Sequence, residues 1–106
     1  MPRNRKQRQC RFLEGQRVFK PPRIPMSELT LYTIGIDEFE AMRLCDHEGL
    51  SQIEASERMK ISRGTVQRLL ERGRRTLLEG ILSNSAVAIS DNAISHSERV
   101  RRAPDL

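Results

Sequence analysis

The sequence of 106 residues is poor in aromatic side chains, with no tryptophan, one tyrosine and three phenylalanines. Proteins that bind single-stranded nucleic acid stack successive bases on several aromatic rings. So few rings argue against that mode of binding. Cysteine is also scarce, because Cys10 and Cys45 form no Cys-x-x-Cys pair and the two histidines, His47 and His96, lie far apart. A zinc site, which needs about four ligands at workable spacing, is therefore not expected.

Long apolar runs are missing as well. The basic N-terminus is not followed by an apolar targeting segment, and no stretch approaches the ~20 apolar residues of a membrane span. We therefore expect a cytoplasmic protein without a membrane partner. No Ser/His/Asp or Cys/His arrangement, phosphate loop or pair of carboxylates stands out, so we expect no enzymatic activity, no cofactor and no metal.

Positive charge is concentrated in two parts of the sequence. The formal net charge is +5, which favours a polyanionic partner. Residues 1–23 carry eight Lys or Arg and one Glu, and residues 51–82 carry seven Lys or Arg and four Glu. Residues 24–50 between them carry one Arg and six acidic residues, and residues 83–106 are balanced. The two basic segments are the candidate contacts for nucleic acid.

The stretch LSQIEASERMKISRGTVQRLL, residues 50–70, carries the start signals of two helices. Ser51 and Glu54 match a capping box, in which each side chain accepts a hydrogen bond from the backbone N–H of the other residue. Ser62 is a second N-cap, directly before RGTVQRLL. Two short helices joined by a tight turn form a helix-turn-helix, whose second helix lies in the major groove of DNA.

The second helix is predicted over residues 63–82. Its apolar stripe follows the helical period and consists of Val66, Leu69, Leu70, Gly73 and Leu77. Its outer face consists of Gly64, Arg68, Glu71 and Arg75, flanked by Thr65 and Gln67. This face either binds DNA or is a solvated surface on which Glu71 and Arg75 pair. Gly73 and Gly80 are expected to weaken the helix by ~1 kcal/mol each relative to Ala.

Arg and Gln side chains suit base recognition, because each can make two hydrogen bonds to the edge of a guanine or an adenine. The candidate base-reading residues are Arg63, Gln67 and Arg68. Phosphates are expected to be bound by cationic side chains and by the positive N-terminus of the second helix. The candidate phosphate-binding residues are Arg3, Arg5, Lys6, Ser62, Arg72 and Arg75. The basic arm could equally serve as a solubilising tail.

The chain is predicted to be a mainly α protein, a three-helix helix-turn-helix of the winged-helix-superfamily type. Residues 1–9 form a flexible basic arm, and residues 10–82 form the DNA-binding domain, which begins with a short β-hairpin. Residues 83–106 form a polar, mostly disordered C-terminal tail, in which AVAIS could pair as one short strand. Because this tail lacks an apolar period, removal of residues 87–106 is expected to leave the melting temperature nearly unchanged.

The first helix of the three is expected within IDEFEAMRLCDHEG. Asp37 is its predicted N-cap, and Glu40 completes a capping-box pattern three residues later. The helix is expected to end near Asp46, before Gly49. Cys45 is interpreted as a small apolar side chain that faces the core.

The segments MPR, FKPPRIP, LYTIG and IDEFEAMRLCDHEGLSQIEASERMKISRGTVQRLL together resemble uncharacterised protein family 0251, a family of short prokaryotic predicted DNA-binding proteins that begin Met-Pro-Arg. The helix-turn-helix of this family resembles region four of housekeeping sigma factors. The resemblance covers roughly residues 1–82. It implies that the second helix reads DNA bases, and its base-reading residues would be Arg63, Thr65, Gln67 and Arg68.

Two residues depart from the family pattern. Lys60 stands where the family tends to have glycine, so it must tolerate a positive φ or a modified turn. Ile53 is apolar where the pattern usually has a polar residue, so its face could touch another element. Some family members carry a second domain after the helix-turn-helix, and its activity is not transferred to this chain.

Two functions remain open at the sequence level. The first is sequence-specific binding of double-stranded DNA by a transcriptional regulator. The second is a protein-interaction module that docks on RNA polymerase or another protein through the acidic stretch 37–48. A homo-oligomer is expected with DNA, and a dimer is the default, because one helix-turn-helix reads only a few base pairs.

Overall fold

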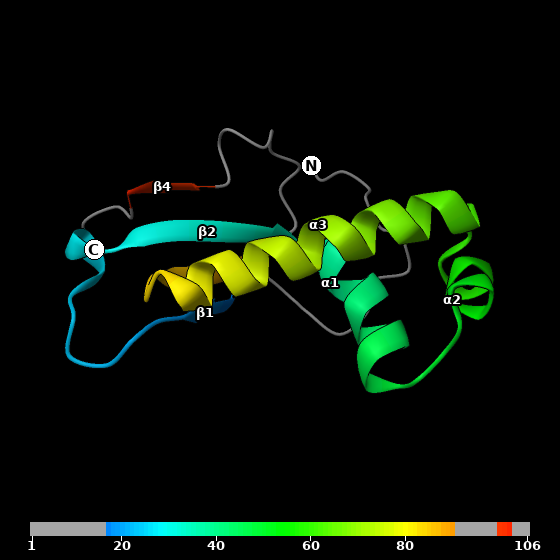
Figure 1. Ribbon diagram of the computed structural model, residues 1–106, viewed down its shortest axis with the longest axis horizontal. Helices are drawn as coiled ribbons and strands as arrows, with labels where there is room; N and C mark the ends of the chain where they lie inside the picture. The colour runs from blue at the N-terminus through cyan, green and yellow to red at the C-terminus, as the bar shows by residue number, and fades with distance from the viewer. Residues whose placement is uncertain (1–16, 91–99, 103–106) are drawn as a thin grey trace, which may run out of the picture.

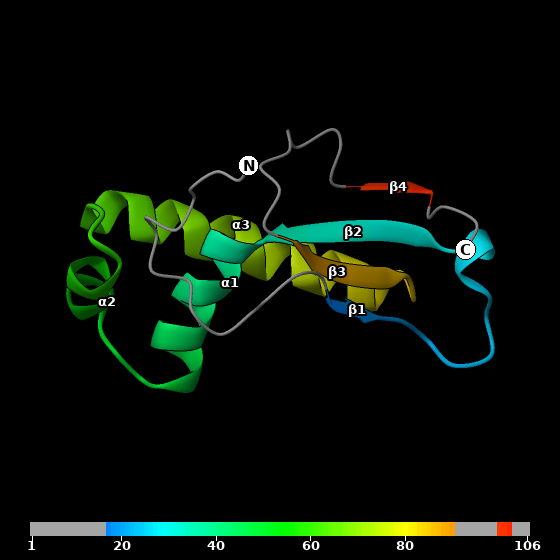
Figure 2. The same ribbon diagram turned by 180° about the vertical axis from the view of Figure 1, so that it is seen from behind.

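The computed structural model describes residues 17–90 and the backbone of residues 100–102. The longest element, helix α3 (Arg63–Leu82), runs along the molecule and joins its two ends. Its N-terminal half belongs to a helical unit and its C-terminal half lies against a β-sheet (Figure 1). The same arrangement is seen from behind in Figure 2, where β3 and β1 lie in front of α3.

The helical unit contains the three predicted helices. α1 spans Ile36–Met42 and continues into a wide π-helical turn, η3, at Arg43–His47; α2 spans Gln52–Met59. The prediction of a mainly helical protein with a three-helix unit and a small β part is confirmed. The start and end predicted for α3, residues 63 and 82, are also confirmed.

A four-stranded mixed sheet forms the other end of the molecule, with the strand order β1-β3-β2-β4. The strands are β1 Arg17–Phe19, β2 Thr30–Gly35, β3 Ala86–Ser90 and β4 Val100–Arg102, and a short 3-10 turn, η2, lies at Met26–Glu28. β3 pairs antiparallel with β1 and parallel with β2, and β2 pairs antiparallel with β4. The first strand of the predicted N-terminal hairpin lies outside the described residues.

The parallel pairing of β2 with β3 makes the helical unit a crossover connection. Parallel neighbours cannot be joined by a tight turn and need a connection of a dozen or more residues. Here that connection is α1, η3, α2 and α3 together. The sheet therefore anchors both ends of the helical unit, the start of α1 after β2 and the end of α3 before β3.

Of the predicted tail, AVAIS forms the inner strand β3 with all five residues buried, which is the short strand that the sequence analysis left open. A strand buried on both faces is a continuous apolar run without alternation, so it lacks the period-2 pattern that marks a surface strand. A local signal precedes it. Asn84 adopts φ 56°, and the N–H groups of Asn84 and Ser85 donate to the carbonyls of Ile81 and Gly80 at 3.0 and 2.9 Å. This Schellman motif ends α3 and turns the chain back to the sheet.

The predicted N-cap of α1 was also wrong. Gly35, not Asp37, is the N-cap, and its N–H donates to the carboxylate of Glu38 at 3.1 Å. Glu40, which was expected to cap, instead accepts from Arg43. The helix starts earlier because Ile36 packs against the sheet, so the chain turns helical as soon as β2 ends.

Two glycines allow α3 to approach its neighbours closely. A Cβ atom at Gly73 would lie 2.6 Å from the sulfur of Met42, and one at Gly80 would overlap the Val87 side chain. Both glycines are buried. Their cost in helix propensity is therefore offset by contact with α1 at one position and with β3 at the other.

We expect a chain that ends at Ser85 to lose cooperative unfolding. Val87 and Ile89 are both buried, and burial of each such side chain contributes ~1.5–3 kcal/mol to a total of only ~5–15 kcal/mol. Thermal unfolding followed by circular dichroism measures this. A chain that ends at Ser90 keeps β3 and serves as the control. Equal melting temperatures for the full chain and the Ser85 form would show that β3 contributes nothing to the fold.

We expect Gly80→Ala to destabilise the protein by ~1–3 kcal/mol, because overpacking outweighs the better helix propensity. Gly64→Ala is the matched control, since its Cβ would meet only the Arg68 side chain, at 3.7 Å, and it is expected to be neutral or stabilising. Denaturant unfolding of both variants gives the two free energies. A stabilised Gly80→Ala variant would contradict the close contact of α3 with β3.

Candidate nucleic-acid interface

Helix α2 begins with the capping box predicted from the sequence. The Ser51 hydroxyl accepts from the N–H of Glu54 at 3.0 Å, and the Glu54 carboxylate accepts from the N–H of Ser51 at 2.8 Å. Ala55 and Met59 on the inner face are fully buried in the same cluster as Val66. The cap fixes where α2 starts, and the buried face fixes its rotation against α3.

The turn between α2 and α3 depends on Lys60, which adopts the left-handed conformation with φ 62° and ψ 44°. The expectation of a positive φ at this residue is confirmed. The N–H of Ile61 donates to the carbonyl of Ser56 at 3.1 Å, and the Ile61 side chain packs against the helical core. The N–H of Lys60 also donates to the carbonyl of Ser56, so the turn is fixed at Lys60 and at the residue that follows it.

The N-terminus of α3 is capped as predicted. The Ser62 hydroxyl accepts from the N–H of Thr65 at 3.1 Å and lies 2.8 Å from the Thr65 hydroxyl. The guanidinium of Arg68 donates to the same Thr65 hydroxyl at 3.4 Å. Ser62, Thr65 and Arg68 therefore form a chain of hydrogen bonds along the first two turns of α3.

The outer face of α3 carries the predicted base-reading residues. Arg63, Gln67 and Arg68 are exposed and Thr65 is half-buried. The pairing of Glu71 with Arg75 that would make this face a solvated, ion-paired surface is not seen among the described residues, and Glu71 instead accepts from Gln67 at 3.5 Å. The predicted phosphate contacts Arg3, Arg5 and Lys6 lie outside the described residues.

The acidic side chains that precede the helix-turn-helix are paired with arginines of the same fold. Arg43 donates to Glu40 at 2.8 and 2.9 Å and also contacts Glu48. The hydrogen bond to Glu40 raises the pKa of the Arg43 guanidinium. Glu48 lies 3.4 Å from Arg58 on α2. The negative charge of this segment thus ties α1 and η3 to α2.

A second pair of contacts ties the same segment to α3. Arg74 donates twice to Asp46, at 2.8 and 3.1 Å, and this hydrogen bonding raises the pKa of Arg74. Arg72 lies 3.6 Å from the carboxylate of Glu38, which is buried. Arg72, predicted to bind phosphate, therefore also balances a buried charge. Arg75, the other phosphate candidate on α3, is exposed.

Gln52 was missed by the sequence analysis. It is the first residue of α2, and its side-chain oxygen accepts from Arg63 at 3.4 Å. This contact brings the start of α2 next to the first residue of α3. The signal was present in the sequence, because the capping box at Ser51 places Gln52 at the first helical position.

Two further findings concern the described residues alone. No cluster of His, Cys, Asp or Glu in them could hold a metal ion. No helix in the same part of the chain combines the length and the apolar character needed to cross a membrane.

A family model described as "Protein of unknown function DUF134" matches residues 1–95. The chain belongs to this family. The sequence resemblance to uncharacterised protein family 0251 agrees with it, because relatives named "UPF0251 protein" are 33–37% identical to the chain. No solved structure matches the chain.

Three relatives show how far the similarity extends along the chain. The relative from Pelotomaculum thermopropionicum is 37% identical over 85% of the chain and 68% of its own length. The one from Moorella thermoacetica is 36% identical over 84% of the chain and 60% of its own length. The one from Rhodospirillum rubrum is 34% identical over 98% of the chain and 80% of its own length. The relatives extend beyond the matched stretch, in some cases by more than a third of their length.

We expect Lys60→Gly to raise stability by up to ~1 kcal/mol. Lys60 has a positive φ, which costs a non-glycine residue energy that glycine avoids, although glycine also gains entropy in the unfolded chain. Denaturant unfolding of both proteins measures the difference. A clear loss of stability would mean that the Lys60 side chain makes contacts that outweigh its backbone strain.

Proposed function

We propose that this protein is a transcriptional regulator that binds double-stranded DNA in a sequence-specific manner, with the N-terminal half of α3 in the major groove. The observation that carries the proposal is the outer face of α3. There Arg63, Gln67 and Arg68 are exposed on a helix whose other face is packed into the helix-turn-helix core. Such a helix presents side chains to base edges without losing its packing.

The ion pairs of the fold support this assignment. Arginines 43, 58, 72 and 74 have carboxylate partners. Within residues 17–90, Arg63, Arg68 and Arg75 form no ion pair, and all three lie on the exposed side of α3. An arginine without a carboxylate partner can bind a phosphate or a guanine without first breaking a salt bridge.

Each residue has a chemical role in this proposal. Arg63 and Arg68 would donate two hydrogen bonds to a guanine, and Gln67 would bind an adenine edge. Thr65 positions Arg68 through the hydrogen bond at 3.4 Å. Ser62 marks the helix N-terminus, where backbone N–H groups and the helix dipole favour a phosphate. Arg75 and the arm residues Arg3, Arg5 and Lys6 would add phosphate contacts.

The alternative function, docking on RNA polymerase or another protein, drew on the acidic stretch 37–48. Glu38, Glu40, Asp46 and Glu48 are all engaged with arginines of this chain. A partner that used these carboxylates would have to compete with those arginines. DNA binding by the outer face of α3 requires no displacement of these ion pairs. The proposed function includes no catalytic step.

We expect Arg68→Ala to cost ~1–3 kcal/mol of specific DNA binding and to relax the preference at one base position. Its effect on stability should stay within ~0.5 kcal/mol, as for surface sites, because the side chain is exposed. Sequences selected from a random duplex pool by the parent protein define the specific site. Fluorescence anisotropy with that site and with random duplexes then gives both affinities.

Two arginines serve as controls for Arg68→Ala. Arg5→Ala, in the arm outside the described residues, should weaken all duplexes about equally and reduce the salt dependence by about one charge. Arg23→Ala should change neither affinity, because Arg23 is exposed in the turn that follows β1, at the sheet end of the molecule (Figure 1). If Arg68→Ala binds specific and random duplexes as the parent does, α3 is not the reading helix and the docking function takes its place.

A further inference from the structure

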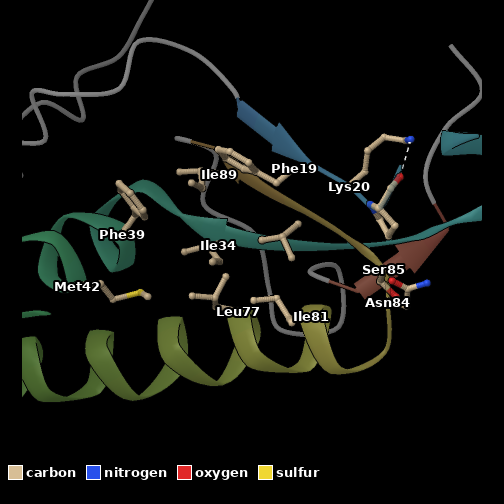
Figure 3. A pocket seen from close by; sticks show the side chains of 12 residues that line it. Phe19, Lys20, Ile34, Phe39, Met42, Leu77, Ile81, Asn84, Ser85 and Ile89 are labelled. Atoms are coloured by element: carbon tan, nitrogen blue, oxygen red, sulfur yellow. Dashed lines mark hydrogen bonds between the residues drawn. The ribbon is translucent and has the colours of Figure 1, made fainter. Parts of the chain in front are cut away.

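An apolar groove lies between the sheet and the C-terminal half of α3. It contains two adjoining cavities of about 500 and 890 Å³. Both cavities are lined by Phe19, Phe39, Met42, Leu77 and Ile89. Figure 3 shows these side chains converging from β1, α1, α3 and β3 into one space. We call this space the sheet-end groove.

The rim of the sheet-end groove exposes large apolar side chains. Phe19 on β1 is 60% exposed, and Leu78, Ile81 and Leu82 on α3 are 55%, 61% and 82% exposed. Leu78, Ile81 and Leu82 follow one another at i, i+3 and i+4, so they form a stripe on one side of the helix. This stripe adjoins the face of α3 that packs on the sheet. Exposed apolar residues gathered at one place mark an interaction surface.

The shape of this surface fits a polypeptide better than a small molecule. A small ligand lies within a pocket that buries most of its surface. Leu82, the most exposed apolar side chain among the described residues, lines neither cavity. A ligand in the groove would therefore leave Leu82 in water, whereas a protein surface could cover the groove and its rim together.

We propose that the sheet-end groove and its rim form an isologous interface with a second copy of this chain. Two exposed charges of opposite sign lie at this surface, Arg17 beside the larger cavity and Glu79 next to Leu78 on α3. Within residues 17–90 neither of them forms an ion pair. A two-fold axis places the same patch on both sides of the interface, so a patch of mixed sign can pair with itself. Among the described strands β1 also lies at an edge of the sheet, and an edge strand can form backbone hydrogen bonds with a second copy.

The position of this interface agrees with the proposed DNA contact. Only this spacing argument rests on the proposed function. Along α3, Arg68 lies 13 residues before Ile81, which is about 20 Å at ~1.5 Å per residue. Two copies joined near Ile81 therefore hold their Arg68 side chains at most about 50 Å apart, including a helix separation of ~10 Å. Crossing of the two helices shortens this distance towards the ~34–36 Å between half-sites one DNA turn apart.

The test is the mass of the full chain in solution without DNA. We expect sedimentation equilibrium to give twice the chain mass of 12.2 kDa. The double substitution Leu78→Glu, Ile81→Glu should raise the dimer dissociation constant more than ~100-fold, because it buries unpaired carboxylates in the interface. Phe19→Glu, on the opposite wall of the groove, should act in the same direction. Helical content measured by circular dichroism should match the parent, since the replaced side chains are exposed.

Ile53→Glu is the matched control. Ile53 is 58% exposed, as exposed as Leu78 and Ile81, but it lies on α2 at the other end of the molecule. We expect this variant to remain a dimer. Dimers that persist in both groove variants would overturn the proposal, as would a parent protein that is monomeric at the highest soluble concentration. In the monomeric case, saturable binding of an apolar dye in the groove would indicate a small ligand, and destabilised groove variants would indicate that another segment of this chain covers the groove.

The outcomes separate this proposal from the DNA assignment. If the protein is a dimer but binds no DNA, the proposed interface stands and the proposed function is wrong. If the protein is a monomer and Arg68→Ala abolishes its DNA binding, the proposed interface is wrong and the proposed function stands.

Discussion

The parallel pairing of β2 with β3 is the constraint on which the rest of the structure depends. Five residue pairs, from Leu31 with Ala86 to Gly35 with Ser90, join segments separated by the whole helical unit. This pairing determines where α1 leaves the sheet and where α3 returns to it. Because Gly80 allows α3 to lie against Val87, the C-terminal half of α3 is anchored on the sheet. Its N-terminal half extends from that anchor and presents the outer face of the helix-turn-helix.

The distribution of charge along the sequence follows from the same architecture. The acidic segment 24–50 supplies the carboxylates that bind arginines of η3, α2 and α3. A partly exposed ion pair contributes little stability alone, but together these pairs join the first helix to the other two. The arginines of α3 therefore fall into two groups, those with a carboxylate partner and those without one. Arg72 and Arg74 form ion pairs with carboxylates of α1 and η3. Arg63 and Arg68 form no ion pair within residues 17–90, so their guanidinium groups face solvent or a ligand.

Local signals made the helix-turn-helix predictable from the sequence. Ser51 with Glu54, and Ser62, form hydrogen bonds within three residues, so their patterns specify the two helix caps without knowledge of the fold. The positive φ of Lys60 was expected only from the resemblance to the family, which tends to have glycine there. The tertiary features could not be read in this way. The strand β3 is a short apolar run between polar residues, and its partner lies more than 50 residues away. Gly35 replaces Asp37 as the N-cap because Ile36 packs on that sheet. Gly73 was placed on the apolar stripe and Gly80 was seen only as a weak helix former, and the fold was needed to show which side chains approach them.

The two ends of the molecule are connected through one side chain. Met42 belongs to the core of the helix-turn-helix and also lines the sheet-end groove. Its sulfur lies against Gly73, near the middle of α3. A side chain that fills the groove beside Met42 would therefore contact a residue of the helical core. The sheet end and the helical end of the molecule thus share one side chain, and α3, which packs against Met42 at Gly73, belongs to both.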